Sequence, residues 1–519
     1  MSGRARRVLE WLARAAGVGL VGAVVSVQAA PVMPVAAVTD TPDTPSRLFR
    51  GEGLVVLDYQ SIHVPGDAPI DLGGFHVLNR VSERVYLGMG AYAPLFKGEY
   101  GGFMAFDVGV HLQQPLTQRL FATAGLAAGG GGGGRSAGHS RFLSGTGGYV
   151  KGHVGLGYAF PQVSVGLNLA QMRFKDAAID DRYANVFVQW PFAFLAGPYD
   201  AHGEALTPLE ARLSAGQARE NMLTLSLEQY RQRDPQGSFK GTLGTADLQY
   251  AHFFDRDTYW FAALGVGHRG RPLYNQLLGG LGQRVWLSPR TSLSAQLGVG
   301  SGGYAPDVID TGAGLLLYPK AAAEYALSPD LGLALSAGYL TAPRGSSRNL
   351  AYGLALNYHV RPAGRAGDAA PVFRASRFSL FQQTGTNVRY GGIDRDPLQM
   401  LAAQLDTQLS ERWFLPLQAS VAWNAYLTYP GYGELLAGIG LQNRHEPGER
   451  VQVYGQLLAG TNPHGPAYKA GAGLHVDIGA PWSLHLSAGR IHARHSDGRR
   501  FQADSLGLGL GYRFSTPGR

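Results

Sequence analysis

The chain has 519 residues, no cysteine and a charged fraction of only 16%. The absence of cysteine excludes disulfides, thiolate metal sites, covalent haem attachment and an N-terminal lipid anchor. A soluble protein usually carries about a quarter of charged residues, so this chain is poor in charge. Its net charge of +8 comes without a dense Lys/Arg cluster beyond the N-terminal region, and nucleic-acid binding is not indicated.

The first 29 residues have the composition of a secretory signal peptide. Arg4, Arg6 and Arg7 precede an apolar stretch from Ala15 to Val25, and small residues follow up to Ala29. The stretch is too short for a membrane-spanning helix, which needs about 20 apolar residues. We therefore expect export from the cytoplasm, with residues 30–52 as an N-terminal extension of the mature protein.

The rest of the chain repeats one pattern of short strands. Similar segments begin at Leu120, Ser292 and Val451, and the composition is rich in Gly (74 residues) and Tyr (25 residues). Repetition at so long a period indicates a repeated architectural unit. We predict three eight-strand units over residues 53–195, 221–360 and 376–514. The expected strands have about nine to thirteen residues, the length that a tilted strand needs to cross a bilayer.

The connections between these strands alternate in length. Ser410–Arg412 is a short turn, whereas 385–396, 460–467 and 493–502 are longer and polar. Short turns on one side and long loops on the other are typical of outer-membrane β-barrels with periplasmic termini. Six consecutive glycines, Gly129–Gly134, fall in a long-loop position. No Lys-Ser/Thr pair follows them, so a flexible outward loop is expected rather than a phosphate-binding loop.

The number of barrels remains open at the level of sequence. The linkers 196–220 and 361–375 are longer than any turn within a unit, which favours three separate eight-strand barrels. The first linker contains Thr207–Leu213, which could form a short helix. However, tandem barrels on one chain are rare, whereas sheets of 22 to 26 strands are a known outer-membrane class. We slightly prefer a single transmembrane antiparallel β-barrel of about 24 strands.

Three lysines recur at the start of the sixth strand of each unit. The alternation along each strand places Lys151, Lys320 and Lys469 on the inward face, because a lysine facing lipid would cost about 2–4 kcal/mol near the midplane. In a single barrel they would line the pore as a ring of positive charge and favour anionic cargo. The alternative is an internal ion pair, for example between Lys320 and Glu324. Arg513, in the last strand, is a further inward charge.

The last outward loop of the third unit contains His495-Ser496-Asp497. It resembles, weakly, the His-x-Ser-Asn motif of eight-strand lipid A deacylases, and that resemblance would imply a lipid-modifying enzyme. Here the His and Ser are adjacent, which departs from the motif. The alternative is a basic loop in which Arg494, Arg499 and Arg500 contact lipopolysaccharide phosphates.

The closing strand, Leu506–Phe514, alternates perfectly between aliphatic or aromatic residues and Gly or Arg. A period of two indicates a strand with one lipid-facing side. It resembles the closing strand of Gram-negative outer-membrane β-barrels. That resemblance implies that Tyr512 and Phe514 form an assembly signal near the membrane interface. Residues 515–519 would then be a tail beyond it.

These features together predict an outer-membrane β-barrel that acts as a channel or export conduit for polysaccharide or protein, with no catalysis of its own. The expected partners are outer-membrane lipid, lipopolysaccharide and the barrel-assembly machinery, with periplasmic export components as further candidates. No cofactor or metal is expected. The two alternatives are a structural or interaction protein of three closed barrels and a lipid-modifying enzyme.

Overall fold

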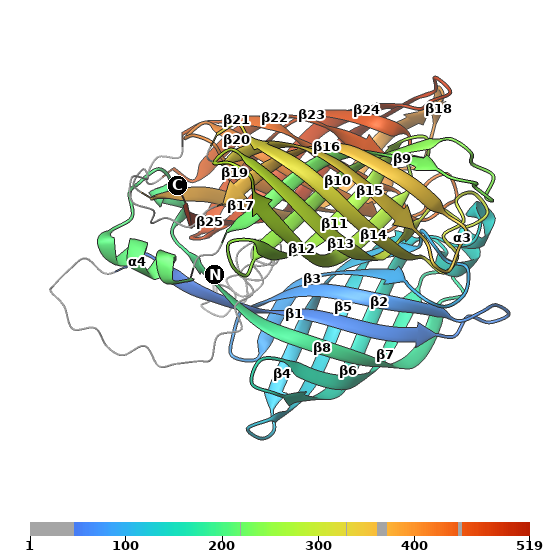
Figure 1. Ribbon diagram of the computed structural model, residues 1–519, viewed down its shortest axis with the longest axis horizontal. Helices are drawn as coiled ribbons and strands as arrows, with labels where there is room; N and C mark the ends of the chain where they lie inside the picture. Colours follow the sequence, from blue (N-terminus) through green and yellow to red (C-terminus); the bar gives the residue numbers. More distant parts are fainter. Residues whose placement is uncertain (1–45, 218–219, 329, 361–370, 445–448, 519) are drawn as a thin grey trace.

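The computed structural model describes residues 46–217, 220–328, 330–360, 371–444 and 449–518. These residues form three antiparallel sheets, and each sheet closes on itself (Figure 1). We name them barrel 1 (β1–β8), barrel 2 (β9–β16) and barrel 3 (β17–β25). The predicted signal peptide lies outside the described residues. In the described part of the chain, no helix is long and apolar enough to cross a membrane.

The strands follow the predicted units closely. Barrel 1 consists of β1 (Phe49–Ile62), β2 (Ile70–Arg80), β3 (Val85–Pro94), β4 (Met104–Pro115), β5 (Leu120–Gly132), β6 (Gly148–Ala159), β7 (Ser164–Phe174) and β8 (Asp180–Ala196). Barrel 2 consists of β9 (Asn221–Gln232), β10 (Thr242–Phe253), β11 (Thr258–Arg269), β12 (Asn275–Trp286), β13 (Thr291–Gly303), β14 (Leu315–Ala326), β15 (Leu331–Thr341) and β16 (Arg348–Val360).

Barrel 3 consists of β17 (Val372–Tyr390), β19 (Leu398–Gln408), β20 (Trp413–Ala422), β21 (Gly433–Gln442), β22 (Val451–Asn462), β23 (Gly465–Gly479), β24 (Trp482–Arg494) and β25 (Arg500–Gly518), with the two-residue β18 (Ile393–Asp394) paired to β17 alone. The remaining elements are helix α3 (Ala137–Ser144) in a loop of barrel 1, and the 3-10 helix η1 (Tyr199–Ala201) and helix α4 (Pro208–Gln217) in the first linker. In barrels 1 and 2 the short turns lie at one end, the turn end, and the longer loops at the other, the loop end. Barrel 3 departs from this pattern, because residues 463–464 alone connect β22 to β23 at the loop end, where the sequence predicted a long loop over 460–467.

The structure differs from the preferred expectation of one 24-strand sheet. The closing strand β25 pairs with β17, with Phe514 opposite Ser376, and not with β1. Likewise β8 pairs with β1 and β16 pairs with β9. The physical reason is that the first and last strands of each unit satisfy one another's backbone hydrogen bonds, so no unit leaves a free edge for its neighbour. The long linkers indicated this outcome correctly.

The inward glycines make room for rings that fill each lumen. A Cβ atom on Gly157 would lie 2.2 Å from Cζ of Phe121 in barrel 1. In barrel 2 a Cβ atom on Gly282 would lie 2.2 Å from Cζ of Tyr259, and in barrel 3 a Cβ atom on Gly440 would lie 2.1 Å from Cζ of Phe414. An eight-strand barrel fills its interior with side chains. Each of these inward glycines therefore leaves the space that an inward aromatic ring on the neighbouring strand occupies.

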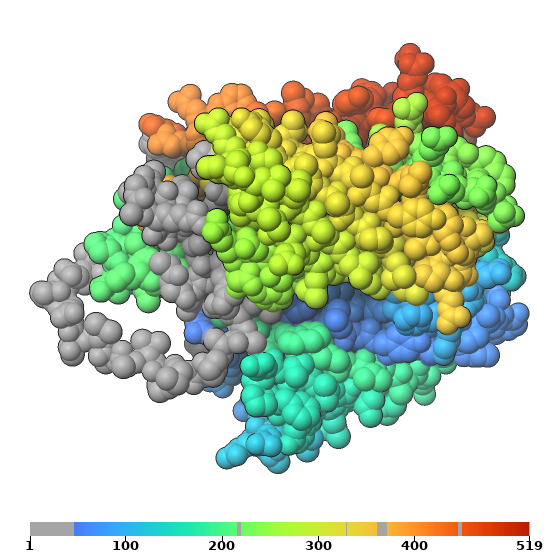
Figure 2. Space-filling model, in the orientation of Figure 1, coloured from blue at the N-terminus to red at the C-terminus, as the bar shows by residue number. Residues whose placement is uncertain are grey.

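At the loop end the three barrels touch through glycine-rich segments. The N–H of Gly101 in barrel 1 donates to the carbonyl of Gly312 in barrel 2 at 2.9 Å. The hydroxyl of Thr461 in barrel 3 donates to the carbonyl of Gly267 in barrel 2 at 2.8 Å. Figure 2 shows the barrels packed against each other on the face in view.

The run of six glycines is not the outward loop that the sequence predicted. Gly129–Gly132 belong to β5, and outward-facing Gly130 is buried against barrel 3. A Cβ atom there would lie 2.4 Å from the carbonyl oxygen of Ala422. Glycine allows such close backbone approach because it has no side chain, and the run is thus a contact seam between barrels 1 and 3.

At the turn end the first linker docks onto barrel 3. Gly197 and Ser515 exchange backbone hydrogen bonds of 2.8 and 2.9 Å. The predicted helix is α4, and it begins with a capping box in which the Glu210 N–H donates to the Thr207 hydroxyl and the Thr207 N–H donates to the Glu210 carboxylate. Burial alone would raise the pKa of Glu210, but hydrogen bonds from the Arg47 side chain and the Thr207 N–H outweigh it and lower the pKa to about 2.

The closing strand ends differently from the expectation. Leu506 and Leu508 are more than half exposed on the outer wall, whereas Tyr512 and Phe514 are buried against barrel 1 rather than placed at a lipid interface. Phe192 and Phe194, from β8, are on the other side of this contact. The predicted tail is also structured, because β25 continues to Gly518.

Candidate functional site

The most regular polar feature is a contact that crosses each lumen from the sixth strand to the first. In barrel 1, Lys151 Nζ lies 3.0 Å from Asp58 Oδ2. In barrel 2, Lys320 Nζ lies 2.9 Å from Glu228 Oε1. In barrel 3, Lys469 Nζ donates to Gln383 Oε1 at 2.9 Å. The alternation of the strands aims all six side chains inward.

These positions correct two expectations drawn from the sequence. The three lysines lie in three separate barrels, so they do not form one ring around a pore. Lys320 pairs with Glu228 and not with Glu324. Glu324 is indeed inward, but it pairs with His359 instead. The reason is that barrel closure brings β9 across from β14, which offers Lys320 a nearer carboxylate than the one four residues along its own strand.

Around the lysine in barrel 2, aromatic and amide groups complete the contacts. The hydroxyls of Tyr318 and Tyr230 donate to Glu228 Oε2 at 2.6 and 2.9 Å. Gln276 donates to Asp247 at 2.8 Å and bonds the Tyr230 hydroxyl at 2.6 Å. Four strands thus meet across the lumen through one hydrogen-bonded group.

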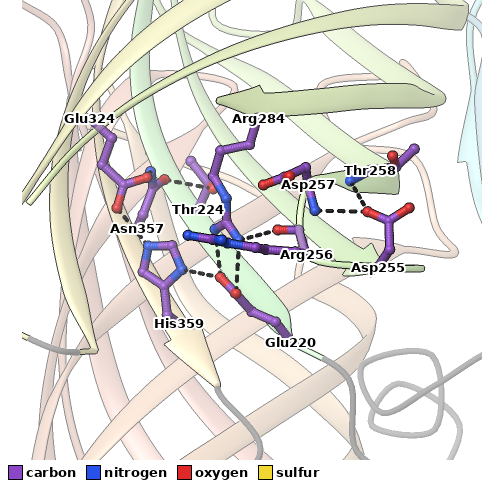
Figure 3. A network of polar contacts seen from close by, with 10 residues as sticks. All are labelled: Glu220, Thr224, Asp255, Arg256, Asp257, Thr258, Arg284, Glu324, Asn357 and His359. Atoms are coloured by element: carbon purple, nitrogen blue, oxygen red, sulfur yellow. Dashed lines mark hydrogen bonds and ion pairs between the residues drawn. The ribbon is translucent and has the colours of Figure 1, made fainter. Parts of the chain in front are cut away.

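A second layer lies nearer the turn end of barrel 2 (Figure 3). Arg284 holds Glu220 with two hydrogen bonds, of 2.6 and 2.8 Å. The ring of His359 bridges Glu220 and Glu324, with nitrogen–oxygen distances of 2.8 and 2.6 Å. Asn357 donates to the other oxygen of Glu324 at 2.8 Å. This layer joins residues of four segments across the lumen, Glu220 before β9, Arg284 of β12, Glu324 of β14 and His359 of β16.

In barrel 3 a buried arginine connects several strands across the lumen. Arg377 is fully buried and lies 3.0 Å from Asp406 Oδ2. It also donates to Gln452 and Gln442, on two further strands. Arg513, the inward charge expected in the closing strand, is buried and lies 2.8 Å from Asp477.

Sequence reasoning missed the partners of these charges. Asp58, Glu228 and Arg377 all sit at inward positions of the first strand of their unit, a coincidence that the repeat alignment could have revealed. Arg377 in particular lies just after the linker, where the unit boundary was placed at residue 376.

The candidate catalytic residues are only partly brought together. His495 Nδ1 lies 2.9 Å from Asp497 Oδ1. Within the described residues, no hydrogen bond joins Ser496 to His495. A nucleophile needs a base within hydrogen-bond reach, and the described residues of this loop do not bring Ser496 and His495 together in that way. Asp497 also accepts from Arg499. Within the described residues, no group of three or more His, Asp or Glu could hold a metal ion.

The predicted lipid-contacting arginines lie at the loop end of barrel 3. Arg494 ends β24 and Arg500 begins β25, and both are exposed, as is Arg499 in the loop between them.

No protein-family model matches the chain, and no curated protein is similar to it. A structure from the de novo design of transmembrane β-barrels is 15% identical with a TM-score of 0.20, covering 27% of this chain and 95% of that one. A mutant of the ferric enterobactin receptor PfeA from Pseudomonas aeruginosa is 9% identical with a TM-score of 0.29, covering 90% and 81%. The KdgM porin is 8% identical with a TM-score of 0.16, covering 56% and 98%. The fold agrees with the resemblance to outer-membrane β-barrels, since the chain is all-β with closed barrels. At these identities and scores the likeness does not bear on function.

Proposed function

We propose that the chain is an outer-membrane protein with three closed lumens, which serves as a membrane-embedded structural or interaction protein and has no catalysis of its own. The observation that carries the proposal is the contact from the sixth strand to the first, repeated across the lumen of each barrel. Buried charges of this kind are costly to desolvate and are held by good geometry. They close a lumen rather than line an open one.

Placement in a membrane is supported by the outer walls. Many large aliphatic side chains face outward and are more than half exposed: Leu126, Leu169, Leu281, Leu335, Leu457, Leu506 and Leu508. Soluble monomers rarely expose contiguous apolar surface on this scale, whereas a barrel in a bilayer carries an outward apolar band. The predicted signal peptide agrees with this placement.

A channel or export conduit, with polysaccharide or protein cargo, stays a prediction. The wide lumen that it required belonged to a single 24-strand sheet, which the described strands do not form. The barrel-assembly machinery and periplasmic export components likewise remain expected partners. A transport role would need a passage other than the three lumens, because side chains meet across each of them.

The test is planar-bilayer conductance of the refolded full chain. Insertion is first verified by heat-modifiable gel mobility and by protease protection in the same lipid. We expect insertion without a large stable conductance, because side chains meet across each lumen. A stable conductance of porin size from inserted protein would overturn the proposal. Deacylation of lipid A by the intact chain would overturn the absence of catalysis.

A further inference from the structure

The outer wall of barrel 3 carries two arginines directly opposite each other. Arg494 of β24 and Arg500 of β25 form the last cross-strand pair at the loop end of this hairpin. Both side chains are exposed on the outward face. Like charges directly opposite each other in a sheet destabilise it, so strand pairing does not explain why both positions carry arginine.

The equivalent position in the other two barrels shows that the fold does not require a pair of opposite arginines there. In barrel 1 the last pair of the equivalent hairpin is Arg173 and Asp180, which form an ion pair of 3.3 Å. In barrel 2 it is Thr341 and Arg348, and Arg348 is occupied by loop carbonyls, including that of Ala342 at 3.0 Å. Only barrel 3 places two positive charges at this site.

The nearby carboxylates are engaged elsewhere. Asp504 accepts from Arg490 at 2.6 Å and from Asn387 at 2.8 Å. Asp497 is shared by His495 and Arg499, while Asp394 pairs with Arg389. Among the residues the structure describes, no carboxylate forms a salt bridge with Arg494 or Arg500. The pair therefore presents uncompensated positive charge.

The pair lies at the rim of the apolar wall. Along this hairpin, Ala488 is opposite Leu506, and the next outward pair is Arg490 with Asp504. Arg494 follows four residues later, about 13 Å along the strand. Tyr468, which is 64% exposed, lies beside His492 on the same face. An outward Tyr above an aliphatic band marks the level of lipid headgroups.

We propose that Arg494 and Arg500 bind the phosphate of a phosphorylated lipid headgroup in the outer leaflet. A phosphate placed between two guanidinium groups accepts charge-assisted, bidentate hydrogen bonds and removes their repulsion. This assignment rests on the proposed placement in an outer membrane, and it gives barrel 3 a specific lipid contact that barrels 1 and 2 lack.

The experiment is native mass spectrometry of the detergent-purified full chain, incubated with bis-phosphorylated lipid A. The double variant Arg494→Gln/Arg500→Gln is expected to bind about 30-fold more weakly, since two basic residues near an anionic lipid surface are lost. Arg500→Asp, which copies the ion pair of barrel 1, is expected to abolish the same binding while the barrel stays folded. Arg173→Gln is the matched control and should leave lipid binding unchanged.

The site would be overturned by undiminished lipid A binding of the folded double variant, by an equal loss in Arg173→Gln or by equal binding of dephosphorylated lipid A. Competition by millimolar inorganic phosphate alone would assign the pair to a free anion instead of a lipid, and would also overturn it. Because the measurement is made in detergent and does not depend on conductance, its failure is distinguishable from failure of the closed-lumen proposal.

Discussion

At the scale of the residue, the interior of each barrel is decided by charges that meet across the lumen. Arg377 has no exposed surface, yet it contacts one carboxylate and two amides from three other strands. Removing one partner of a buried ion pair leaves an uncompensated charge, whereas replacing both by apolar groups is often neutral. The energetic role of Arg377 is therefore testable by comparing single and double substitutions.

We expect Arg377→Met to lower the free energy of unfolding by about 3–5 kcal/mol, because Asp406 is left buried without its cation. The double variant Arg377→Met/Asp406→Leu should recover most of this loss. Urea unfolding of the chain refolded into lipid vesicles measures both. Arg444→Gln, which breaks an exposed pair with Glu411 in the same barrel, is the control and should cost at most about 1 kcal/mol. Equal costs for the single and double variants would contradict this role.

The residues also show which part of the interior was predictable. Alternation along the strand correctly placed Lys151, Lys320 and Lys469 inside, because side-chain direction in a strand is a local property. Their partners were not predictable in the same way. Asp58 and Glu228 come near a lysine only when the first strand closes against the eighth.

At the scale of the element, glycine serves two separate purposes along the strands. Inward glycines such as Gly440 accommodate a neighbouring ring, and outward glycines such as Gly130 allow another barrel to approach. Both kinds look alike in the sequence, which is why the run Gly129–Gly134 predicts a loop. In the structure Gly129–Gly132 pair with β4, and the loop after β20, which contains Trp423 and Pro430, packs against β5 and β6.

Gly130→Val is expected to disturb the seam between barrels 1 and 3. The added side chain would clash with the Ala422 carbonyl, and overpacking of this kind costs about 1–3 kcal/mol. We expect faster amide hydrogen exchange in the segment from Trp423 to Tyr432, with the strands of barrel 1 still protected. Gly138→Ala, where an added Cβ atom meets nothing within 4 Å, is the control. Unchanged exchange in Gly130→Val would show that the seam does not hold the barrels together.

At the scale of the whole molecule, closure of each unit determines what the protein can do. The predicted unit repeat and the predicted alternation of turns and loops, which barrel 3 follows only in part, are compatible with one large barrel and with three small ones. The distinction depends on the partners of the last strand of each unit, β8, β16 and β25. These pairings decide whether the inward residues face one wide pore or three narrow interiors.

The absence of cysteine in the chain makes the pairing of β25 directly testable. Leu380 and Leu510 are cross-strand partners on the outer face of barrel 3, and antiparallel partners lie within disulfide range. Leu380→Cys with Leu510→Cys should therefore form a disulfide on mild oxidation, seen as a mobility shift that a reductant reverses. Leu57→Cys with Leu508→Cys, which would place cysteines on β1 and β25, should not. The reverse pattern would indicate one continuous sheet.

From the sequence alone one can predict local properties: the all-β class, the inward or outward direction of side chains along each strand and most of the turns between strands. These depend on residue periodicity and on neighbours along the chain. Only the folded chain shows which strands close each sheet, which charges meet across a lumen and which glycines face another barrel. Those outcomes depend on contacts between residues far apart in sequence, and strands with the same alternation can be paired in more than one closed arrangement.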